Sequence, residues 1–327
     1  VLDLLAERST QVETLDLALR EYGFFYVKNH SLDDSIQAQF QMAKKLFDLP
    51  QEEKDSMPFD SQLDIGYVGQ HGQNLDPTLE QQQVEQEEKN GVVDHQSPTD
   101  TKEQFMQTNN CLITSGSDPP NAPIIDPSNV FAGSKNYQPN VTDYTAVTSH
   151  YASLAYQLNQ KLNDLLFDAL GLDTETRAKL AHQPFMVLKQ MKYAGEPSDP
   201  SKGKFGAGAH CDWGSFTILA TDQTPGLQIY HNHEWLPVPP KPDCLIINSG
   251  DQIAQLTNDT YKSALHRVVT TSTQPRYSTA VFTYFNVYTK VGPLPQFLNA
   301  EQDSKYPSRT TLEYFHFKLH QSFGVTA

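Results

Sequence analysis

The sequence predicts a mainly β fold with flanking helices, and two patterns carry the prediction. Beyond Pro184 the chain divides into short runs of apolar, β-branched and aromatic residues separated by Gly, Pro, Asn or Asp. Before that point, apolar residues recur at steps of three and four, which is the spacing of amphipathic helices. Many short strands without helices between them are typical of an antiparallel sandwich or barrel.

The N-terminal segment is expected to form two helices around one strand. Residues 10–13 have the form of a capping box, and apolar residues follow at helical spacing as far as Gly23. A strand is expected around 24–26 and a second helix over 36–47. His30 is interpreted as a hydrogen-bonding turn residue and not as a metal ligand.

Residues 74–97 are rich in Gln, Glu and Asn and poor in apolar side chains. Such a stretch cannot bury enough surface to offset its ordering entropy unless something packs on it. It is interpreted either as a solvated insertion or as a lid over a pocket. The predicted organisation is an N-terminal cap over 1–125, which contains this insertion, and a main β domain over 126–327, both within one integrated fold.

The rest of the chain is expected to form one long helix, a series of strands and a closing helix. The long helix starts near 142, ends at Gly171 and has its apolar residues on one side, so it is expected to back a sheet. The strands are expected at 185–193, 215–221, 227–231, 244–248, 252–257, 266–272 and 277–285, and the closing helix at 312–323.

Composition argues against several classes of partner and location. The chain has 24 basic and 39 acidic residues, and this net charge of −15 opposes binding to nucleic acid or to anionic membranes. Three widely spaced cysteines give neither a disulfide framework nor a zinc pattern, so a reducing, cytoplasmic setting is expected. No run of about 18 apolar residues is present to span a bilayer. The first residues become polar too soon for a signal peptide, although the missing initiator Met leaves room for a removed leader.

His210, Asp212 and His266 are the candidate metal ligands. In an extended strand alternate side chains share a face, so His210 and Asp212 point the same way and Cys211, a small apolar filler, points away. His266 opens an apolar, β-branched run and is the best third ligand. Two imidazoles and one carboxylate leave one side of an ion open, which suits non-haem Fe(II). Zn²⁺, Mn²⁺ or Ni²⁺ could occupy the same ligands.

Two further residue pairs have different interpretations. His231 and His233 lie between two predicted strands, so a hairpin turn is expected there and not a metal site. Arg276 offers an always charged fork for a carboxylate, and Ser278 adds a hydroxyl donor on the same strand face. A small acid is therefore expected between the metal and this clamp.

Other polar and aromatic residues near these motifs are expected to have structural roles. Asn248 and Asp251 are interpreted as residues that fix a turn. The pocket wall and core are expected to include Trp213, Phe216, Phe282 and Phe285.

The candidate ligands and the clamp occur with further motifs along most of the chain, at 23–30, 226–229, 234–238, 245–251 and 261–268. In this combination and order they resemble the isopenicillin N synthase-like family of 2-oxoglutarate/Fe(II)-dependent dioxygenases. The resemblance implies a double-stranded β-helix, or jelly roll, flanked by N-terminal helices, a long central helix and a C-terminal helix.

The resemblance also implies an oxidoreductase that uses Fe(II), 2-oxoglutarate and O₂, with ascorbate as a supporting reductant. His210, Asp212 and His266 would bind the iron, and Arg276 and Ser278 would bind the far carboxylate of 2-oxoglutarate. The products would be succinate, CO₂ and an oxidised small molecule, with hydroxylation as the usual outcome and desaturation or ring closure as others.

Tyr193 occupies the place of a tyrosine that commonly assists this clamp in the family. Its neighbours depart from the family pattern, because Met191 stands where many relatives have Asn and Ala194 where they have Pro. The contact of Tyr193 with the clamp is therefore an expectation from resemblance alone.

Two alternatives to this function stay open at the level of sequence. One is a non-haem Fe(II) oxidase of the same fold whose clamp holds another acid. The other is a β-barrel binding protein without turnover. The expected partner is a small-molecule substrate, with neither nucleic acid nor membrane, and the sequence gives no indication of the oligomeric state.

Overall fold

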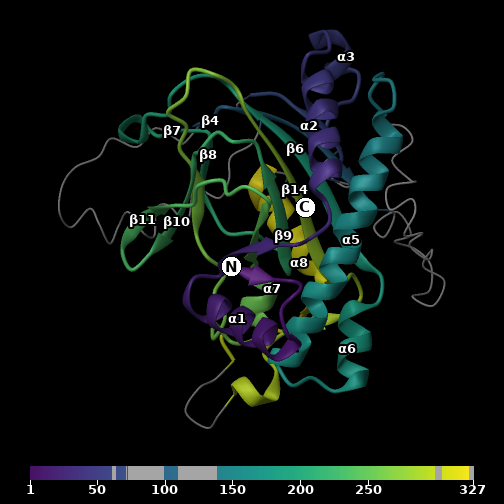
Figure 1. The fold of residues 1–327 in the computed structure, drawn as a ribbon, viewed down its shortest axis with the longest axis vertical. Helices are drawn as coiled ribbons and strands as arrows, with labels where there is room; N and C mark the ends of the chain where they lie inside the picture. The colour runs from purple at the N-terminus through teal and green to yellow at the C-terminus, as the bar shows by residue number, and fades with distance from the viewer. Residues whose placement is uncertain (61–63, 71, 73–98, 110–137, 299–303, 324–327) are drawn as a thin grey trace.

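The computed structural model describes residues 1–60, 64–70, 72, 99–109, 138–298 and 304–323. Figure 1 shows a large twisted sheet with long helices along one side and a smaller sheet on the other. The predicted insertion at 74–97, with the choice between a solvated loop and a lid, lies outside the described residues.

The large sheet contains strands from both predicted parts of the chain. Its central strands come from the main β domain, whereas the strands at both edges come from the first 125 residues. All neighbours are antiparallel except the first two, which are parallel. In spatial order the strands are β1 (Leu2–Asp3), β2 (Phe24–Lys28), β12 (Cys244–Ser249), β9 (Phe216–Thr221), β14 (Arg276–Asn286), β6 (Pro184–Tyr193), β5 (Lys102–Thr108) and β3 (Gly66–Val68).

The smaller sheet is antiparallel and completes the predicted jelly roll. Its β10–β11 connection is a turn over Asn232 and His233, which both have positive φ angles, as a tight hairpin turn requires. The prediction that His231 and His233 belong to a hairpin is therefore confirmed. In spatial order the strands are β11 (Glu234–Pro237), β10 (Leu227–His231), β13 (His266–Val268) and β8 (Ala207–His210).

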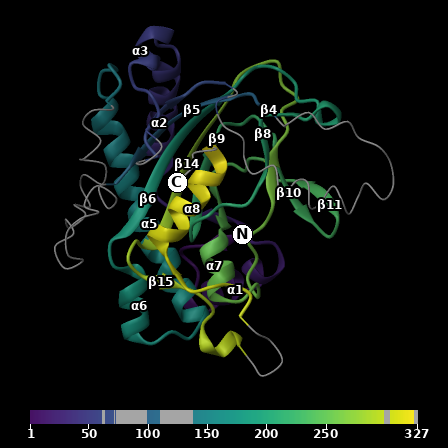
Figure 2. The same cartoon turned by 180° about the vertical axis from the view of Figure 1, so that it is seen from behind.

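Helices pack against the outer face of the large sheet and around its end. Both α2 and the long α5 contact β14, and α8 lies against the opposite side of that strand region in Figures 1 and 2. The predicted long helix and closing helix are confirmed. The helices are α1 (Arg8–Glu21), α2 (Asp33–Phe47), α3 (Gln51–Asp55), α5 (Tyr144–Ala169), α6 (Thr174–Ala181), α7 (Asp251–Leu256) and α8 (Thr311–Phe323), and the remaining short strands are β4 (Thr99–Asp100), β7 (Lys204–Phe205), β15 (Lys290–Val291) and β16 (Arg309–Thr310).

Strand β14 divides the core from the pocket by simple alternation. Its odd-numbered side chains, such as Val281 and Phe285, are fully buried in the cluster that includes Leu162 and Leu166 of α5. Its even-numbered side chains, including Ser278 and Phe282, line the space between the two sheets. The helices therefore anchor the outer face of the wall whose inner face forms the pocket.

The predicted capping box of the first helix is wrong. Helix α1 begins at Arg8, two residues before Thr10, and its N-cap residue Glu7 makes no side-chain cap. The Gln11 side chain instead donates hydrogen bonds to the carbonyls of Leu4 and Ala6, so it ties the chain that enters the helix. Gly23 follows the helix with φ +65°, which agrees with the predicted end.

The predicted strand at 252–257 is also wrong, because these residues lie in helix α7. Short apolar runs do not distinguish a strand from a buried helical turn. The backbone supplies the deciding contacts: the N–H groups of Asp251 and Gln252 donate to the carbonyls of Asp212 and Gly214 and so satisfy the first turn. The strand expected at 266–272 is shorter than predicted, since β13 ends at Val268 and Thr270 N–H donates to the Ser198 side chain.

Gly250 lies where this helix meets the loop after β8. A Cβ atom at this position would stand 2.5 Å from the carbonyl oxygen of Gly214 and 2.7 Å from that of Asp212. Both are backbone atoms, so they cannot move aside as a flexible side chain can.

We expect Gly250→Ala to lower the free energy of unfolding by about 1–3 kcal/mol, because overpacking forces the backbone to shift. Urea unfolding followed by circular dichroism measures the effect. Gly69→Ala is the matched control, since the nearest atoms to its Cβ belong to the Tyr67 ring at 3.8 and 3.9 Å. Equal losses in the two variants would contradict the packing argument.

Candidate active site

The three predicted metal ligands meet at the junction of the two sheets. His210 is the last residue of β8, Asp212 lies two residues beyond it, and His266 opens β13 directly opposite His210. Asp212 Oδ1 stands 3.8 Å from His210 Nε2 and 3.7 Å from His266 Nε2. Strand alternation alone therefore does not place Asp212, because the strand has already ended.

The ligand atoms of these three residues all lie within 4.8 Å of one another, and among the described residues they form the group suited to hold a metal ion. Each imidazole is fixed by its other nitrogen: His210 Nδ1 donates to the Gly208 carbonyl at 2.8 Å and His266 Nδ1 to the Ala264 carbonyl at 3.0 Å. Both Nε2 atoms are thus the acceptor nitrogens, which is the tautomer that a metal requires.

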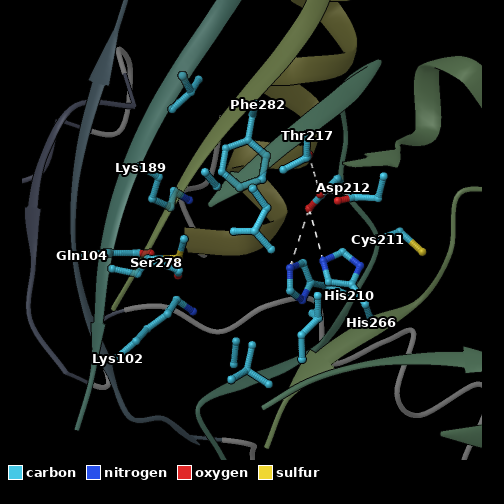
Figure 3. Close-up of a pocket in the computed structure, with 18 of the residues that line it drawn as sticks. Lys102, Gln104, Lys189, His210, Cys211, Asp212, Thr217, His266, Ser278 and Phe282 are labelled. Carbon is cyan, nitrogen blue, oxygen red and sulfur yellow. Dashed lines mark hydrogen bonds and ion pairs between the residues drawn. The ribbon is translucent and has the colours of Figure 1, made fainter. Parts of the chain in front are cut away.

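The carboxylate of Asp212 is oriented by the large sheet. Its Oδ2 atom accepts hydrogen bonds from Thr217 Oγ1 at 2.5 Å and from Asn248 Nδ2 at 2.7 Å, which leaves Oδ1 facing the imidazoles. Figure 3 shows the Asp212 carboxylate between Thr217 and the imidazoles of His210 and His266. The prediction that Asn248 fixes a turn is wrong, because β12 continues through it and its side chain points to the metal ligand.

The protonation of His210 and Asp212 suits a cation. Burial, and next the adjacent His266 ring, lower the pKa of His210 to about 3. Burial alone would raise the pKa of the Asp212 carboxyl, but the two imidazoles and the hydrogen bonds from Thr217 and Asn248 hold it below its ordinary value. The site therefore offers neutral imidazole and ionised carboxylate, the forms that coordinate a metal.

Arg276 and Ser278 form the other end of the same pocket. They follow one another on the inner face of β14 and are 2% and 1% exposed. Arg276 Nε donates to the Thr224 carbonyl at 3.2 Å, while its Nη1 atom and Ser278 Oγ have no hydrogen-bond partner within the described residues. Buried polar groups are nearly always paired, so two such donors side by side fit a bound carboxylate.

Tyr193 contacts the clamp through its ring. It pairs with Arg276 across β6 and β14, and the Arg276 guanidinium lies 4.7 Å from the Tyr193 ring centroid. Its hydroxyl group donates to the sulfur of Met191 at 3.5 Å. Met191, which replaces the Asn of the family pattern, therefore accepts the hydrogen bond of the Tyr193 hydroxyl. The face of the Tyr193 ring contacts the guanidinium.

The pocket between metal ligands and clamp is lined by both apolar and charged residues. Trp213 and Phe282 line it, and Phe216 and Phe285 are fully buried, as predicted. Cys211 points away from the ligands in Figure 3 and its sulfur lies 3.4 Å from the Ser263 carbonyl.

The sequence interpretation missed three charged residues that line the pocket: Asp64, Lys102 and Lys189. Lys102 forms a buried ion pair with Asp100, and Asp100 Oδ1 also accepts the Gly208 N–H at 2.8 Å. The alternation of β6 could have revealed Lys189, because it lies on the same strand face as Tyr193.

Asp251 has a structural role at the back of the site. Its carboxylate accepts hydrogen bonds from Ser263 Oγ at 2.7 Å and from the Tyr314 hydroxyl at 2.6 Å, so it connects α7 to α8. The prediction that Asp251 fixes a turn is wrong, because Asp251 is the first residue of α7.

Comparison with protein families supports a non-haem iron oxygenase. Residues 183–284 match the 2OG-Fe(II) oxygenase superfamily, and residues 1–113 match the family described as non-haem dioxygenase in morphine synthesis N-terminal. The chain is 27% identical to clavatol oxidase claD of Penicillium crustosum, covering 96% of this chain and 91% of that protein. It is 28% identical to gibberellin 20 oxidase 4 of Arabidopsis thaliana, covering 92% and 72%.

Solved structures share the fold over nearly the whole chain. A full-length protein of Neurospora crassa, solved in complex with alpha-KG and thymine, superposes with a TM-score of 0.74 at 22% identity, covering 97% of this chain and 95% of that one. A putative 2OG-Fe(II) oxygenase family protein from Caulobacter crescentus gives a TM-score of 0.75 at 23% identity, covering 98% and 97%.

The chain belongs to the family of 2-oxoglutarate/Fe(II)-dependent dioxygenases, in its isopenicillin N synthase-like branch. It is an oxidoreductase whose cofactor is Fe(II) and whose co-substrates are 2-oxoglutarate and O₂. The predicted jelly-roll fold, reaction class and cofactors are confirmed, and the alternative without 2-oxoglutarate has no support from the comparisons. Among the described residues, no helix is long and apolar enough to cross a membrane.

We expect Asn248→Ala to weaken Fe(II) binding by about 10- to 100-fold, because the Asp212 carboxylate loses one of its two hydrogen-bond donors. Anaerobic titration with Fe(II) measures the affinity. Asn286→Ala serves as the control, since its side chain donates to the His182 carbonyl at the exposed end of β14. Unchanged affinity in Asn248→Ala would mean that Thr217 alone orients the ligand.

Proposed function

We propose that His210, Asp212 and His266 bind the catalytic Fe(II), and that Arg276 and Ser278 bind the far carboxylate of 2-oxoglutarate. The substrate is a small molecule with a C–H bond that the enzyme hydroxylates. The proposal is carried by two donors, Arg276 Nη1 and Ser278 Oγ, that have no hydrogen-bond partner in the described part of the chain and are buried in the pocket that holds the three metal ligands.

The protein's own part in this reaction is to hold and orient the reactants. Bound Fe(II) together with 2-oxoglutarate and O₂ supplies the oxidising power, and succinate and CO₂ are the products. The clamp fixes one end of the co-substrate, and the guanidinium of Arg276 packs on the face of the Tyr193 ring. Because the clamp lies on the large sheet and the two histidines lie on the small sheet, the orientation of 2-oxoglutarate is set by the jelly roll itself.

The small-molecule substrate is supported by the position of the site and by the relatives. The pocket lies between the two sheets, so a substrate must enter the barrel to reach the metal ligands. Relatives include a homoarginine-6-hydroxylase of Glycine max, 27% identical over 86% of this chain and 80% of that protein, whose name specifies hydroxylation of a small molecule.

Anaerobic titration of the Fe(II)-loaded protein with 2-oxoglutarate tests the assignment. We expect the weak visible charge-transfer band of a chelated 2-oxo acid to appear, and Asp212→Ala to abolish it. If Fe(II) binds and no band develops, the clamp serves another acid.

We expect Arg276→Lys to raise the dissociation constant for 2-oxoglutarate by about 30-fold or more, because a point charge cannot replace the two-pronged contact of a guanidinium. The same charge-transfer titration measures it. Arg20→Lys is the matched control, as Arg20 lies on the surface and pairs with Asp16. A change of less than about threefold in Arg276→Lys would argue against the clamp.

A further inference from the structure

Lys189 lies on the inner wall of the pocket, on the strand next to the clamp and level with Ala280, between Ser278 and Phe282. It lies two residues before Met191 on the inner face of β6, and it pairs with Ala280 of β14. Its Nζ atom stands 5.2 Å from the centroid of the Phe282 ring. Figure 3 shows the side chain on the sheet wall, across the pocket from the metal ligands.

Lys189 differs from the other lysines of this region because it has no direct counter-ion among the residues that the structure describes. Lys54 and Lys192 both form ion pairs with Glu103, and Lys102 forms one with Asp100. Within the described residues the Lys189 ammonium makes no ion pair and no hydrogen bond, and its contact is with the ring of Phe282. Burial lowers its pKa, which reflects the cost of a cation without a partner.

The proposed iron and co-substrate do not supply that partner. The far carboxylate of 2-oxoglutarate is matched by Arg276 and Ser278, and its 2-oxo acid end by the metal. Asp64 is the first of the carboxylates that act on Lys189, but no ion pair joins the two residues. Burial raises the pKa of Asp64, so this residue is a weak counter-charge.

The sheet order separates Lys189 from the metal ligand Asp212. The metal ligand Asp212 accepts a hydrogen bond from Thr217 of β9, whereas Lys189 is on β6. Strand β14 lies between β9 and β6. Two strand spacings amount to about 10 Å. A molecule whose charged group is held at Lys189 would therefore turn its opposite end towards the metal, past the ring of Phe282.

We infer that Lys189 binds an anionic oxygen of the substrate, and that the substrate is a small acid with an apolar, ring-bearing body. The carboxylate or phenolate accepts hydrogen bonds from Lys189 Nζ, and the body packs against Phe282 with Trp213 and Tyr284 nearby. This assignment rests on the proposed function, because it takes the clamp and the metal to be occupied by 2-oxoglutarate.

The test uses the full-length protein with saturating Fe(II) and 2-oxoglutarate under anaerobic conditions, so that the clamp cannot capture the probe. Two acids, benzoate and cinnamate, are compared with their neutral isosteres, benzamide and cinnamamide. Paramagnetic broadening of the probe's ring protons gives the dissociation constants. We expect the acids to bind wild type about tenfold tighter or more, and Lys189→Met to remove the difference.

Two further variants complete the comparison. Lys189→Arg keeps the charge and is expected to keep the preference for acids. Lys192→Met removes a lysine three residues along β6, on the opposite face of the strand, and is expected to leave the preference unchanged. Formation of the 2-oxoglutarate charge-transfer band in every variant verifies that the protein is folded and loaded.

The outcomes separate this inference from the proposed function. Absence of the band in wild type defeats the proposed function before any probe is added. Loss of the band in Lys189→Met alone overturns the inference, because Lys189 would then serve 2-oxoglutarate. If no acid binds better than its amide, or if benzylamine binds better than either, the inference is also overturned, and in the second case Asp64 becomes the anchor.

Discussion

The buried carboxylate of Asp212 is the constraint on which the rest of the site depends. Its Oδ2 atom is held by Thr217 and Asn248 of the large sheet, and its Oδ1 atom faces the imidazoles of the small sheet. A charge buried in this way is tolerated only when hydrogen bonds and an opposite charge surround it. The two sheets must therefore meet in one relative position, and α7 secures it by donating the Asp251 N–H to the Asp212 carbonyl.

Charge is distributed unevenly along the pocket that this junction closes. The metal end presents one carboxylate and two imidazole rings, whereas the sheet wall presents the guanidinium of Arg276 and the ammonium of Lys189. Lys102, by contrast, is neutralised by Asp100, which also bonds to β8. The two proposed anion-binding residues thus lie on the sheet wall, and the carboxylate that suits a cation lies at the metal end.

Part of this arrangement could be predicted from the sequence, because the His-x-Asp pair and the later His266 indicated a metal site, although Asp212 lies beyond the end of β8. Strand alternation also predicted that Arg276 and Ser278 share one face of a strand, as they do on β14. Other features depend on contacts between distant segments: α7 forms because carbonyls near the metal ligands satisfy its first turn. Asn248 was interpreted as a turn residue because its hydrogen-bond partner, Asp212, lies 36 positions earlier in the chain and cannot be recognised from the neighbouring residues. Such pairings have no signature in the local pattern.

The make-up of the large sheet affects how the chain can fold. Its middle strands fall within residues 184–286, but β1, β2, β3 and β5 form its two edges and come from the first 108 residues. Nearly all of its pairings thus join segments far apart in sequence, which favours slow folding. A fragment lacking those residues would leave β12 and β6 as long, unpaired strand edges. Such edges template association between chains, so the N-terminal strands also protect the catalytic half from aggregation.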